Sequence, residues 1–303
     1  MNYQSKSYKS GKLEKHKSVL IEKVLFKIAK QWIAGDTMDD ALKSARQANM
    51  NGMNAILNKL GEHMTSKAQV SQTVSDYLTL VSNLRRSKIT GGLSIKPTQV
   101  GLAISAKECI SNLDTIIEKA LQFQSFVWID MESSEYTDAT FKIYQTLFEK
   151  YERVGIVIQA NLKRTWNDLD MLLKKGAKIR LVKGAYHENS VNAYKTRHAV
   201  DENYRKLMSV LFEHGNEFAI ATHDSKIIDL AIDLSKKYER KFEFQMLKGI
   251  RDEIKPILIK NEFSVSEYIP YGTNWLPYSI RRLRERKRNI LLLGSSFIHS
   301  HRV

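Results

Sequence analysis

Eight short apolar segments recur along this sequence from about residue 52 onward, and a helical pattern follows each of them. Such alternation of strands and helices is the mark of βαβ units and a parallel sheet. It therefore constrains the fold more than any other feature. The predicted strands are 53–57, 92–96, 126–131, 154–160, 179–183, 218–222, 242–246 and 267–270.

Helical patterns fill the intervals between these predicted strands. They cover 70–86, 106–123, 137–151, 166–175, 199–214, 225–238 and 252–260, and an arginine-rich helix comes last. Eight strands each followed by a helix favour a closed (β/α)8 barrel over an open sheet. No Gly-x-Gly-x-x-Gly follows a strand, which disfavours a doubly wound dinucleotide fold.

The chain length suits one barrel with an N-terminal extension. A barrel needs roughly 250 residues, and the chain has 303. We expect an N-terminal helical arm at 1–48 and the barrel domain at 49–303. The arm carries one apolar stripe, Leu20, Val24, Leu25 and Ile28, which more often packs on a neighbour than enters a membrane.

Charge and cysteine content narrow the class of partner and the compartment. The formal net charge is +15, which favours an acidic partner such as nucleic acid, an anionic membrane surface or an anionic small molecule. Cys109 is the single cysteine, so the chain has no internal disulfide framework. No apolar run reaches 18 residues, and we expect a cytoplasmic protein.

Candidate site residues, most of them polar, stand at or near the carboxyl end of one predicted strand after another, where a barrel builds its active site. They are Lys96, Asp130, Met131, Glu132, Gln159, Arg180, Lys183, Thr222, His223, Asp224, Gln245 and Tyr268. A charge in a dry interior implies a partner or a ligand. Some of these residues could instead have a purely structural role. Lys96 and Asp130 could form an ion pair between adjacent strands, and His223 could be a hydrogen-bonded histidine of the core. Candidates on seven predicted strands at once favour a functional site over separate structural roles.

The last predicted helix carries Tyr278, Arg281, Arg282 and Glu285 at i, i+3, i+4 and i+7. These spacings put all four on one face. Two adjacent guanidinium groups suit a carboxylate ligand better than lysines do. Composition alone favours a solvated basic helix, because runs of charge usually lie on the surface.

The segment from Tyr271 to Glu285 resembles the C-terminal signature of the proline dehydrogenases, through Tyr-Gly-x-x-Trp-x-x-Tyr-x-x-Arg-Arg-Leu-x-Glu. Further segments resemble the family in its order: 54–62, 94–102, 129–132, 159–160, 180–186, 221–223 and 243–247. The resemblance covers nearly the whole chain except the arm. It implies a distorted (β/α)8 barrel with the last helix across its mouth, and FAD-dependent oxidation of L-proline to 1-pyrroline-5-carboxylate.

The resemblance also implies the substrate-binding residues. Arg281, Arg282 and Lys96 would bind the substrate carboxylate, while Asp130 orients and balances Lys96 as part of the catalytic site. The residues implied around the proline ring are Tyr268, Tyr278 and Leu247. Glu285 would anchor the guanidinium of Arg281.

Most of the remaining strand-end residues are implied in binding FAD. Arg180 would lie beside flavin N5, where a fixed positive charge favours the reduced flavin. The segment Val182, Lys183, Gly184 and Ala185 would meet the phosphates and ribityl chain. The rest of the implied cofactor shell is Met131, Gln159, Thr196, Arg197, Thr222, His223 and Gln245. No metal is expected.

Two positions depart from the family pattern. Asp224 follows Thr-His where the family leads us to expect Asn, and Asn161 follows Gln-Ala where we expect Tyr. Both departures concern contacts with the flavin rather than the class of reaction.

The family implies a membrane quinone as electron acceptor, which is compatible with peripheral contact of this basic protein with the inner face of the cell membrane. No nucleic acid partner is expected. Two alternatives stay open at this point: another FAD barrel oxidoreductase similar to methylenetetrahydrofolate reductase, and a basic protein that binds nucleic acid or a membrane surface. The first should not need paired arginines on its last helix.

Overall fold

A closed barrel of eight parallel strands, in the order β1 to β8, forms the centre of the protein in a computed structural model that describes residues 29–282. Pairing of β1 with β8, from Asn54 opposite Ser266 to Lys59 opposite Tyr271, closes it. The strands are β1 (Asn54–Lys59), β2 (Gly91–Ile95), β3 (Phe126–Ile129), β4 (Val154–Gln159), β5 (Lys178–Val182), β6 (Glu217–Ala221), β7 (Lys241–Leu247) and β8 (Val265–Tyr271). All eight predicted strands are confirmed, with ends that differ by a few residues.

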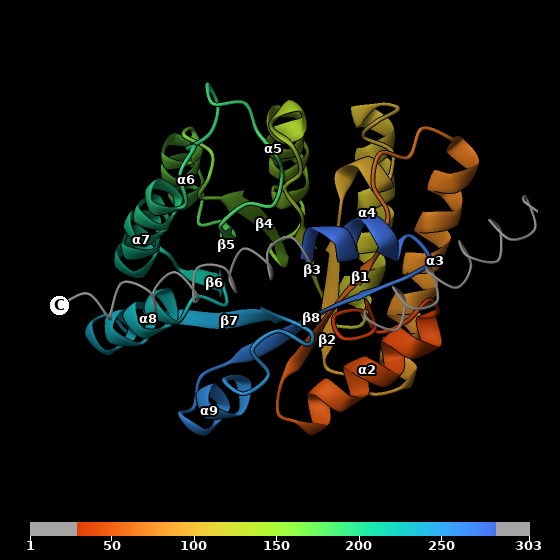
Figure 1. The fold of residues 1–303 in the computed structure, drawn as a ribbon. Helices are drawn as coiled ribbons and strands as arrows, with labels where there is room; N and C mark the ends of the chain where they lie inside the picture. Colours follow the sequence, from red (N-terminus) through yellow and green to blue (C-terminus); the bar gives the residue numbers. More distant parts are fainter. Residues whose placement is uncertain (1–28, 283–303) are drawn as a thin grey trace, which may run out of the picture.

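Helices surround this barrel, one after each of the first seven strands (Figure 1). They are α3 (Lys67–Arg86), α4 (Ala106–Gln122), α5 (Ser134–Phe148), α6 (Thr165–Lys174), α7 (Arg197–His214), α8 (Ser225–Lys237) and α9 (Lys255–Lys260). A short 3-10 helix, η1 (Pro97–Gln99), follows β2. Their inner faces pack on the outside of the strands in one continuous core. The (β/α)8 prediction is thereby confirmed.

The helix predicted at 252–260 starts later than expected. α9 begins at Lys255, and residues 252–254 form a turn. Arg251 has a φ of 54°, which a helix interior excludes, and Pro256 suits the first turn of a helix because its missing N–H is not needed there.

The N-terminal arm is only partly helical within the described residues. α2 (Met38–Met50) is a helix whose Thr37 cap and Asp40 form a reciprocal capping box. Residues 30–37 were expected to be helical, but they form turns and irregular backbone. Ala34 N–H donates to the carbonyl of Pro270, and the N–H of Gly272 donates to the carbonyl of Gly35, so this segment is bonded to the end of β8 instead. The predicted stripe Leu20, Val24, Leu25 and Ile28 lies outside the described residues.

α2 packs on the outside of the barrel against β1 and β8. It buries Ala41, Leu42, Ala45 and Ala48 in the main core. The helix after β8 does not cover the outside of β1 and β8, because it lies over the carboxyl end of the barrel. α2 therefore covers the seam where the barrel closes.

The last helix starts at residue 275 and is described as far as 282. Trp275 and Tyr278 pack with Ala29, Trp32 and Leu60 in a small separate cluster. Trp32 Nε1 also donates a hydrogen bond of 3.1 Å to Ser279 Oγ. The expected placement across the barrel mouth is confirmed for this part of the helix, and Glu285 lies outside the described residues. Among residues 29–282, no helix has the length and apolar character needed to cross a bilayer.

Candidate active site

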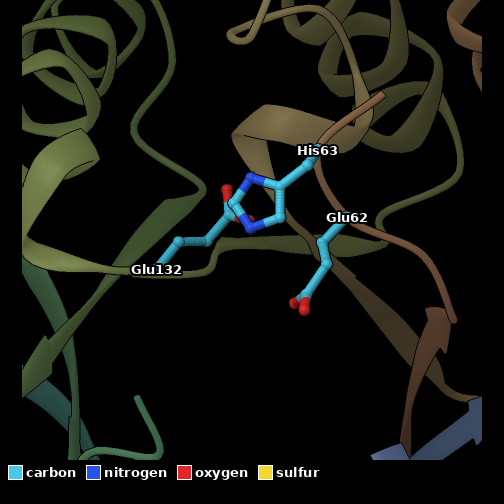
Figure 2. A group of neighbouring side chains, drawn as sticks. All are labelled: Glu62, His63 and Glu132. Atoms are coloured by element: carbon cyan, nitrogen blue, oxygen red, sulfur yellow. The ribbon is translucent and has the colours of Figure 1, made fainter. Parts of the chain in front are cut away.

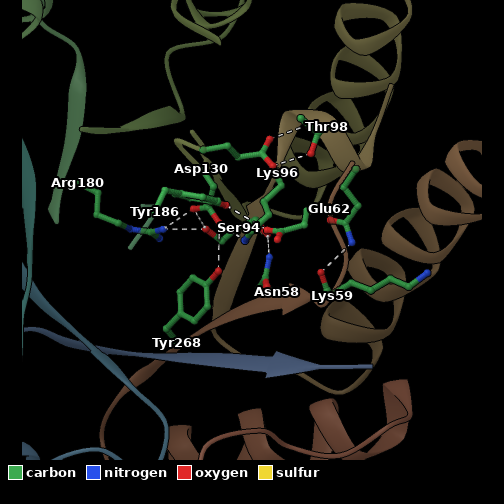
Figure 3. Close-up of polar contacts among 12 residues, drawn as sticks. Asn58, Lys59, Glu62, Ser94, Lys96, Thr98, Asp130, Arg180, Tyr186 and Tyr268 are labelled. Carbon is green, nitrogen blue, oxygen red and sulfur yellow. Dashed lines mark hydrogen bonds and ion pairs between the residues drawn. The ribbon is translucent and has the colours of Figure 1, made fainter. Parts of the chain in front are cut away.

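Asp130 is the centre of a buried polar cluster at the carboxyl end of β3. Its carboxylate accepts hydrogen bonds from Ser94 Oγ (2.6 Å), Arg180 Nη1 (3.0 Å), Tyr268 Oη (3.1 Å) and Lys96 Nζ (3.3 Å) (Figure 3). Burial by itself raises the pKa of Asp130, but the charges of Lys96 and Arg180 bring it below its usual value. The carboxylate is therefore ionised, and it joins side chains from β2, β3, β5 and β8.

Lys96 follows β2 and shares Asp130 as its counter-charge. Although burial disfavours the ammonium group, the charge of Asp130 raises the pKa of Lys96 above its ordinary value. Lys96 therefore remains a cation beneath the barrel mouth. The predicted pairing of Lys96 with Asp130 is present, and it forms part of a larger cluster than a simple ion pair.

Arg180 lies inside the barrel between two aromatic rings. Its guanidinium carbon is 4.6 Å from the ring centre of Trp128 and 5.6 Å from that of Tyr268. The side chain is 4% exposed, and its Nε and Nη2 atoms have no hydrogen-bond partner among the described residues. Buried donors are normally satisfied, so these two indicate a missing acceptor.

Glu62 pairs with Arg281, and the sequence reasoning assigned it no role. Arg281 Nη1 lies 3.1 Å from Glu62 Oε1, and Tyr186 Oη donates to Glu62 Oε2 at 3.2 Å. Burial raises the pKa of Glu62, but the charges of Arg281 and Lys96 bring it below its usual value. The sequence does carry a signal for Glu62, because this residue ends the Leu-Gly-Glu of segment 54–62, which resembles the family. This contact joins the β1–α3 loop to the last helix across the mouth.

Arg282 lies on the same turn of the last helix, with its guanidinium carbon 5.4 Å from the ring centre of Tyr278. Tyr278 is buried, and its predicted place beside the substrate stays a prediction. The charge of Arg282 also acts on His223, which lies at the end of β6. The two adjacent arginines therefore face different neighbours.

Three possible metal ligands converge beside this cluster. Ligand atoms of Glu62, His63 and Glu132 all lie within 4.8 Å of one another (Figure 2). Glu132 already accepts from the backbone N–H of Thr98 at 2.9 Å and from its hydroxyl at 2.6 Å. Lys96 places a positive charge near both carboxylates, which opposes a second cation.

Lys183 follows β5 and is held by two carboxylates. Its Nζ lies 2.5 Å from Asp201 Oδ1 and 2.7 Å from Asp224 Oδ2. Arg197, the first residue of α7, lies 3.7 Å from Asp201 and 3.6 Å from Asp224. Thr196 caps the same helix through a hydrogen bond from Ala199 N–H. Two cations and two carboxylates thus compensate each other here, and the unexpected Asp224 supplies one of them.

The backbone of Gly184, which follows β5, lies close to the side chain of Asn161, which follows β4. Gly184 has a φ of 103°, and a Cβ there would lie 2.1 Å from Asn161 Oδ1. This Oδ1 is buried and has no partner among the described residues. Ala185 is exposed and Val182 half-buried, so the segment borders open space at the mouth.

His223 is neutral and fixes the end of β7. Burial, then the charges of Arg282 and Lys255, lower the pKa of His223 to about 3. Its Nε2 accepts from the backbone N–H of Leu247 at 2.9 Å. The adjacent Thr222 is buried, and its hydroxyl accepts from Asp224 N–H at 3.2 Å. The histidine is thus satisfied, and it also positions Leu247 at the mouth.

Gln159, Gln245 and Met131 complete the ring of buried strand ends. Gln159 Nε2 donates to the carbonyl of Glu132 at 2.9 Å. Gln245 Oε1 has no partner among the described residues. Most predicted site residues within 29–282 end or directly follow a strand, whereas Arg180 and Tyr268 lie within β5 and β8, inside the barrel. Ser94, Trp128 and Tyr186 were missed, although two of them stand within quoted motifs.

A closed (β/α)8 barrel with a charged, partly unsatisfied cluster at the carboxyl ends of its strands defines a barrel enzyme. Residues 41–291 match the family described as proline dehydrogenase. Proline dehydrogenase 1 of Bacillus subtilis is 33% identical over 264 residues, which are 86% of this chain and 87% of that protein. Proline dehydrogenase of Deinococcus radiodurans is 33% identical over 281 residues, 89% of this chain and 90% of that one.

A solved structure shares the fold. Proline utilization A from Bdellovibrio bacteriovorus, inactivated by N-propargylglycine, superposes with a TM-score of 0.80 at 25% identity. The match covers 87% of this chain and 33% of that longer protein. The chain belongs to the proline dehydrogenase family, and it is an oxidoreductase. The predicted family is confirmed.

Proposed function

We propose that this protein oxidises L-proline to 1-pyrroline-5-carboxylate with FAD as its cofactor. The observation that carries the proposal is the Asp130 cluster, in which two buried donors of Arg180 have no acceptor within residues 29–282. Membership of the proline dehydrogenase family supports this reaction over the two alternatives, another FAD barrel oxidoreductase and a basic protein that binds nucleic acid or a membrane surface.

The residues at the mouth fit a flavin. The isoalloxazine ring presents hydrogen-bond acceptors and a donor along one edge, and the site offers the donors of Arg180 and the acceptor Gln245 Oε1. Lys183 and Arg197 would meet the phosphates, beside the glycine backbone of Gly184. The other residues that would hold FAD are Met131, Gln159, Val182, Ala185, Thr196, Thr222 and His223.

When bound, FAD would accept a hydride from the proline carbon beside the ring nitrogen. The amine must be deprotonated at that moment, so that its lone pair forms the C=N bond as the hydride leaves. The protein holds the substrate and supplies charge. Asp130 keeps Lys96 and Arg180 in place, and Arg180 favours negative charge at the site where electrons arrive.

The substrate carboxylate would be bound by Lys96, Arg281 and Arg282. Arg281 is paired with Glu62 in this structure, so a carboxylate ligand must share or replace that contact. Tyr268, Tyr278 and Leu247 would enclose the apolar ring, and the predicted support of Arg281 by Glu285 lies outside the described residues. The hydroxyl of Tyr268 donates a hydrogen bond to Asp130, and this bond directs the ring of Tyr268 into the site.

Electrons would pass from the flavin to a membrane quinone, with the protein bound peripherally to the inner face of the cell membrane. The net charge of +15 supports contact with an anionic lipid surface. Nucleic acid is not proposed as a partner.

Anaerobic addition of L-proline to the purified, FAD-loaded protein tests the reaction. We expect the absorption of oxidised flavin to bleach as 1-pyrroline-5-carboxylate appears in equal amount. Persistence of the oxidised spectrum, in protein that has bound FAD, would rule out the proposed reaction.

A further inference from the structure

Glu243 lies inside the barrel in line with Arg180, and the reaction proposed above gives it no role. Arg180 on β5 pairs in register with Ala219 on β6, and Ala219 pairs with Glu243 on β7. Neighbouring strands are about 4.8 Å apart, so two strand spacings separate the backbones of Arg180 and Glu243. Ala219 is fully buried and has only a methyl group, so no bulky side chain stands between the two charges.

The carboxylate of Glu243 decides how the amide of Gln245 is oriented. Gln245 Nε2 donates to Glu243 Oε1, and Ser266 Oγ donates to Glu243 Oε2. An ionised carboxylate only accepts hydrogen bonds, so the amide must turn its NH2 group toward Glu243. Gln245 Oε1 is left as a buried acceptor without a partner among the described residues. This acceptor is one of the groups that fit the flavin.

A cavity of about 540 Å³ opens at the amino-terminal end of the barrel and reaches this carboxylate. Trp128, Glu243 and Ser266 are among its lining residues. Contact with the cavity leaves Glu243 half-buried. A charge in that position costs less desolvation than a fully buried one.

The charge of Glu243 also acts on Arg180. Burial lowers the pKa of Arg180, while the negative charges of Asp130 and, more weakly, Glu243 raise it. Arg180 therefore has Asp130 as a direct partner at 3.0 Å and Glu243 as a more distant negative charge in the same layer of the barrel.

We propose that Glu243 is a positioning residue for the flavin site, which fixes the amide of Gln245 and offsets part of the charge of Arg180. The inference rests on the flavin binding proposed above. Glu243 touches neither substrate nor cofactor in this scheme, and it acts through two residues that do.

Two substitutions separate the two roles. Glu243→Asp keeps the charge but shortens the side chain, so it should weaken binding of FAD to the apoprotein by about tenfold, as expected for one lost charge-assisted hydrogen bond. Glu243→Gln removes the charge, so it should raise the midpoint potential of the bound flavin, because added electrons then meet less repulsion. The measurements are a titration of apoprotein with FAD and a redox titration.

Glu217→Gln is the matched control. Glu217 is another half-buried carboxylate lining the same cavity, but it pairs with Lys178 (3.1 Å) and Lys241 (3.2 Å) rather than with Gln245. We expect both FAD affinity and potential to stay at the wild-type values. A Gln245→Met background should abolish the effect of Glu243→Asp on FAD affinity, because the oriented amide is gone.

Additive losses in that double variant, or Glu243 variants that behave like Glu217→Gln, would overturn the inference while leaving the proposed function intact. Wild-type protein that binds no FAD would overturn both. If Glu243→Gln does not fold, the FAD affinities of Glu243→Asp and of the double variant Glu243→Asp/Gln245→Met still test whether Glu243 positions Gln245.

Discussion

Arg281 on the last helix lies 3.1 Å from Glu62 in the β1–α3 loop, although 219 residues separate them in the sequence. The pair is only partly buried, with Arg281 30% and Glu62 23% exposed. Such a pair contributes little to stability by itself, on the order of 1 kcal/mol or less. Its position suggests a functional use, because it holds a guanidinium group at the mouth of the barrel.

Substitution of the paired arginines should separate substrate binding from folding. Arg281→Met and Arg282→Met should fold and bind FAD, yet lose most of their kcat/KM with proline, because a lost charge contact with a substrate carboxylate, once that contact is buried by the bound substrate, costs about 2–5 kcal/mol. Prolinamide, which lacks the carboxylate, should lose far less. Steady-state kinetics with both substrates make the comparison, and Arg205→Met, which removes a half-buried arginine paired with Glu202 on α7, is the control. Equal losses with the two substrates would assign the arginines to another role.

Arg180 should control the flavin rather than substrate affinity. Arg180→Met removes a fixed positive charge, so the midpoint potential of the bound flavin should fall and its reduction by proline should slow by about 100-fold or more. Stopped-flow reduction under anaerobic conditions measures the rate. Reduction at the wild-type rate would remove Arg180 from the site.

Asp224 should weaken FAD binding through Lys183. Asp224→Asn removes one of the two carboxylates that hold Lys183, which frees positive charge for a phosphate group. We expect up to about fivefold tighter FAD binding, the scale of a partly exposed ion pair. Asp233→Asn, which breaks an exposed pair with Lys236, is the control in the same FAD titration. Weaker binding by Asp224→Asn would show that the carboxylate helps the site instead.

Asp130 should stabilise the fold in a pH-dependent way. Asp130→Asn leaves Lys96 and Arg180 buried without their shared counter-charge, so the free energy of unfolding should fall by about 3–5 kcal/mol at neutral pH. Because the pKa of Asp130 is lowered in the folded state, its contribution is complete above about pH 4 and declines at lower pH. Urea unfolding of both proteins at several pH values measures the difference. A constant difference down to pH 2 would contradict the lowered pKa.

Membrane contact should depend on ionic strength. If the basic surface binds anionic lipid, association with phosphatidylserine vesicles should weaken steeply as salt rises, since exposed charges are screened beyond about 10 Å at 0.1 M. Co-sedimentation with anionic and with neutral vesicles tests this expectation. Binding that ignores salt would assign the association to another force.

Most of the strands and helices could be predicted from the local sequence. The eight strands and the seven helices between them follow from apolar runs and helical periodicity, which are properties of a few consecutive residues. Errors occurred where tertiary contacts overrode local preference. Residues 30–37 are not helical, because their backbone forms hydrogen bonds with the end of β8. Helix α9 starts later than predicted, because the chain turns at Arg251.

Apolar runs and the polar residues that follow them are visible in the sequence, and a parallel barrel necessarily gathers its strand ends at one mouth. Lys96, Asp130, Arg180 and Tyr268 were predicted in this way. Their contacts are visible only in the folded protein: Asp130 accepts from four donors at once and Glu62 pairs with Arg281. The fold also places Glu243 in the same layer of the barrel as Arg180. Those contacts join segments far apart in the chain. Strand register and barrel closure set them, and no local pattern encodes either.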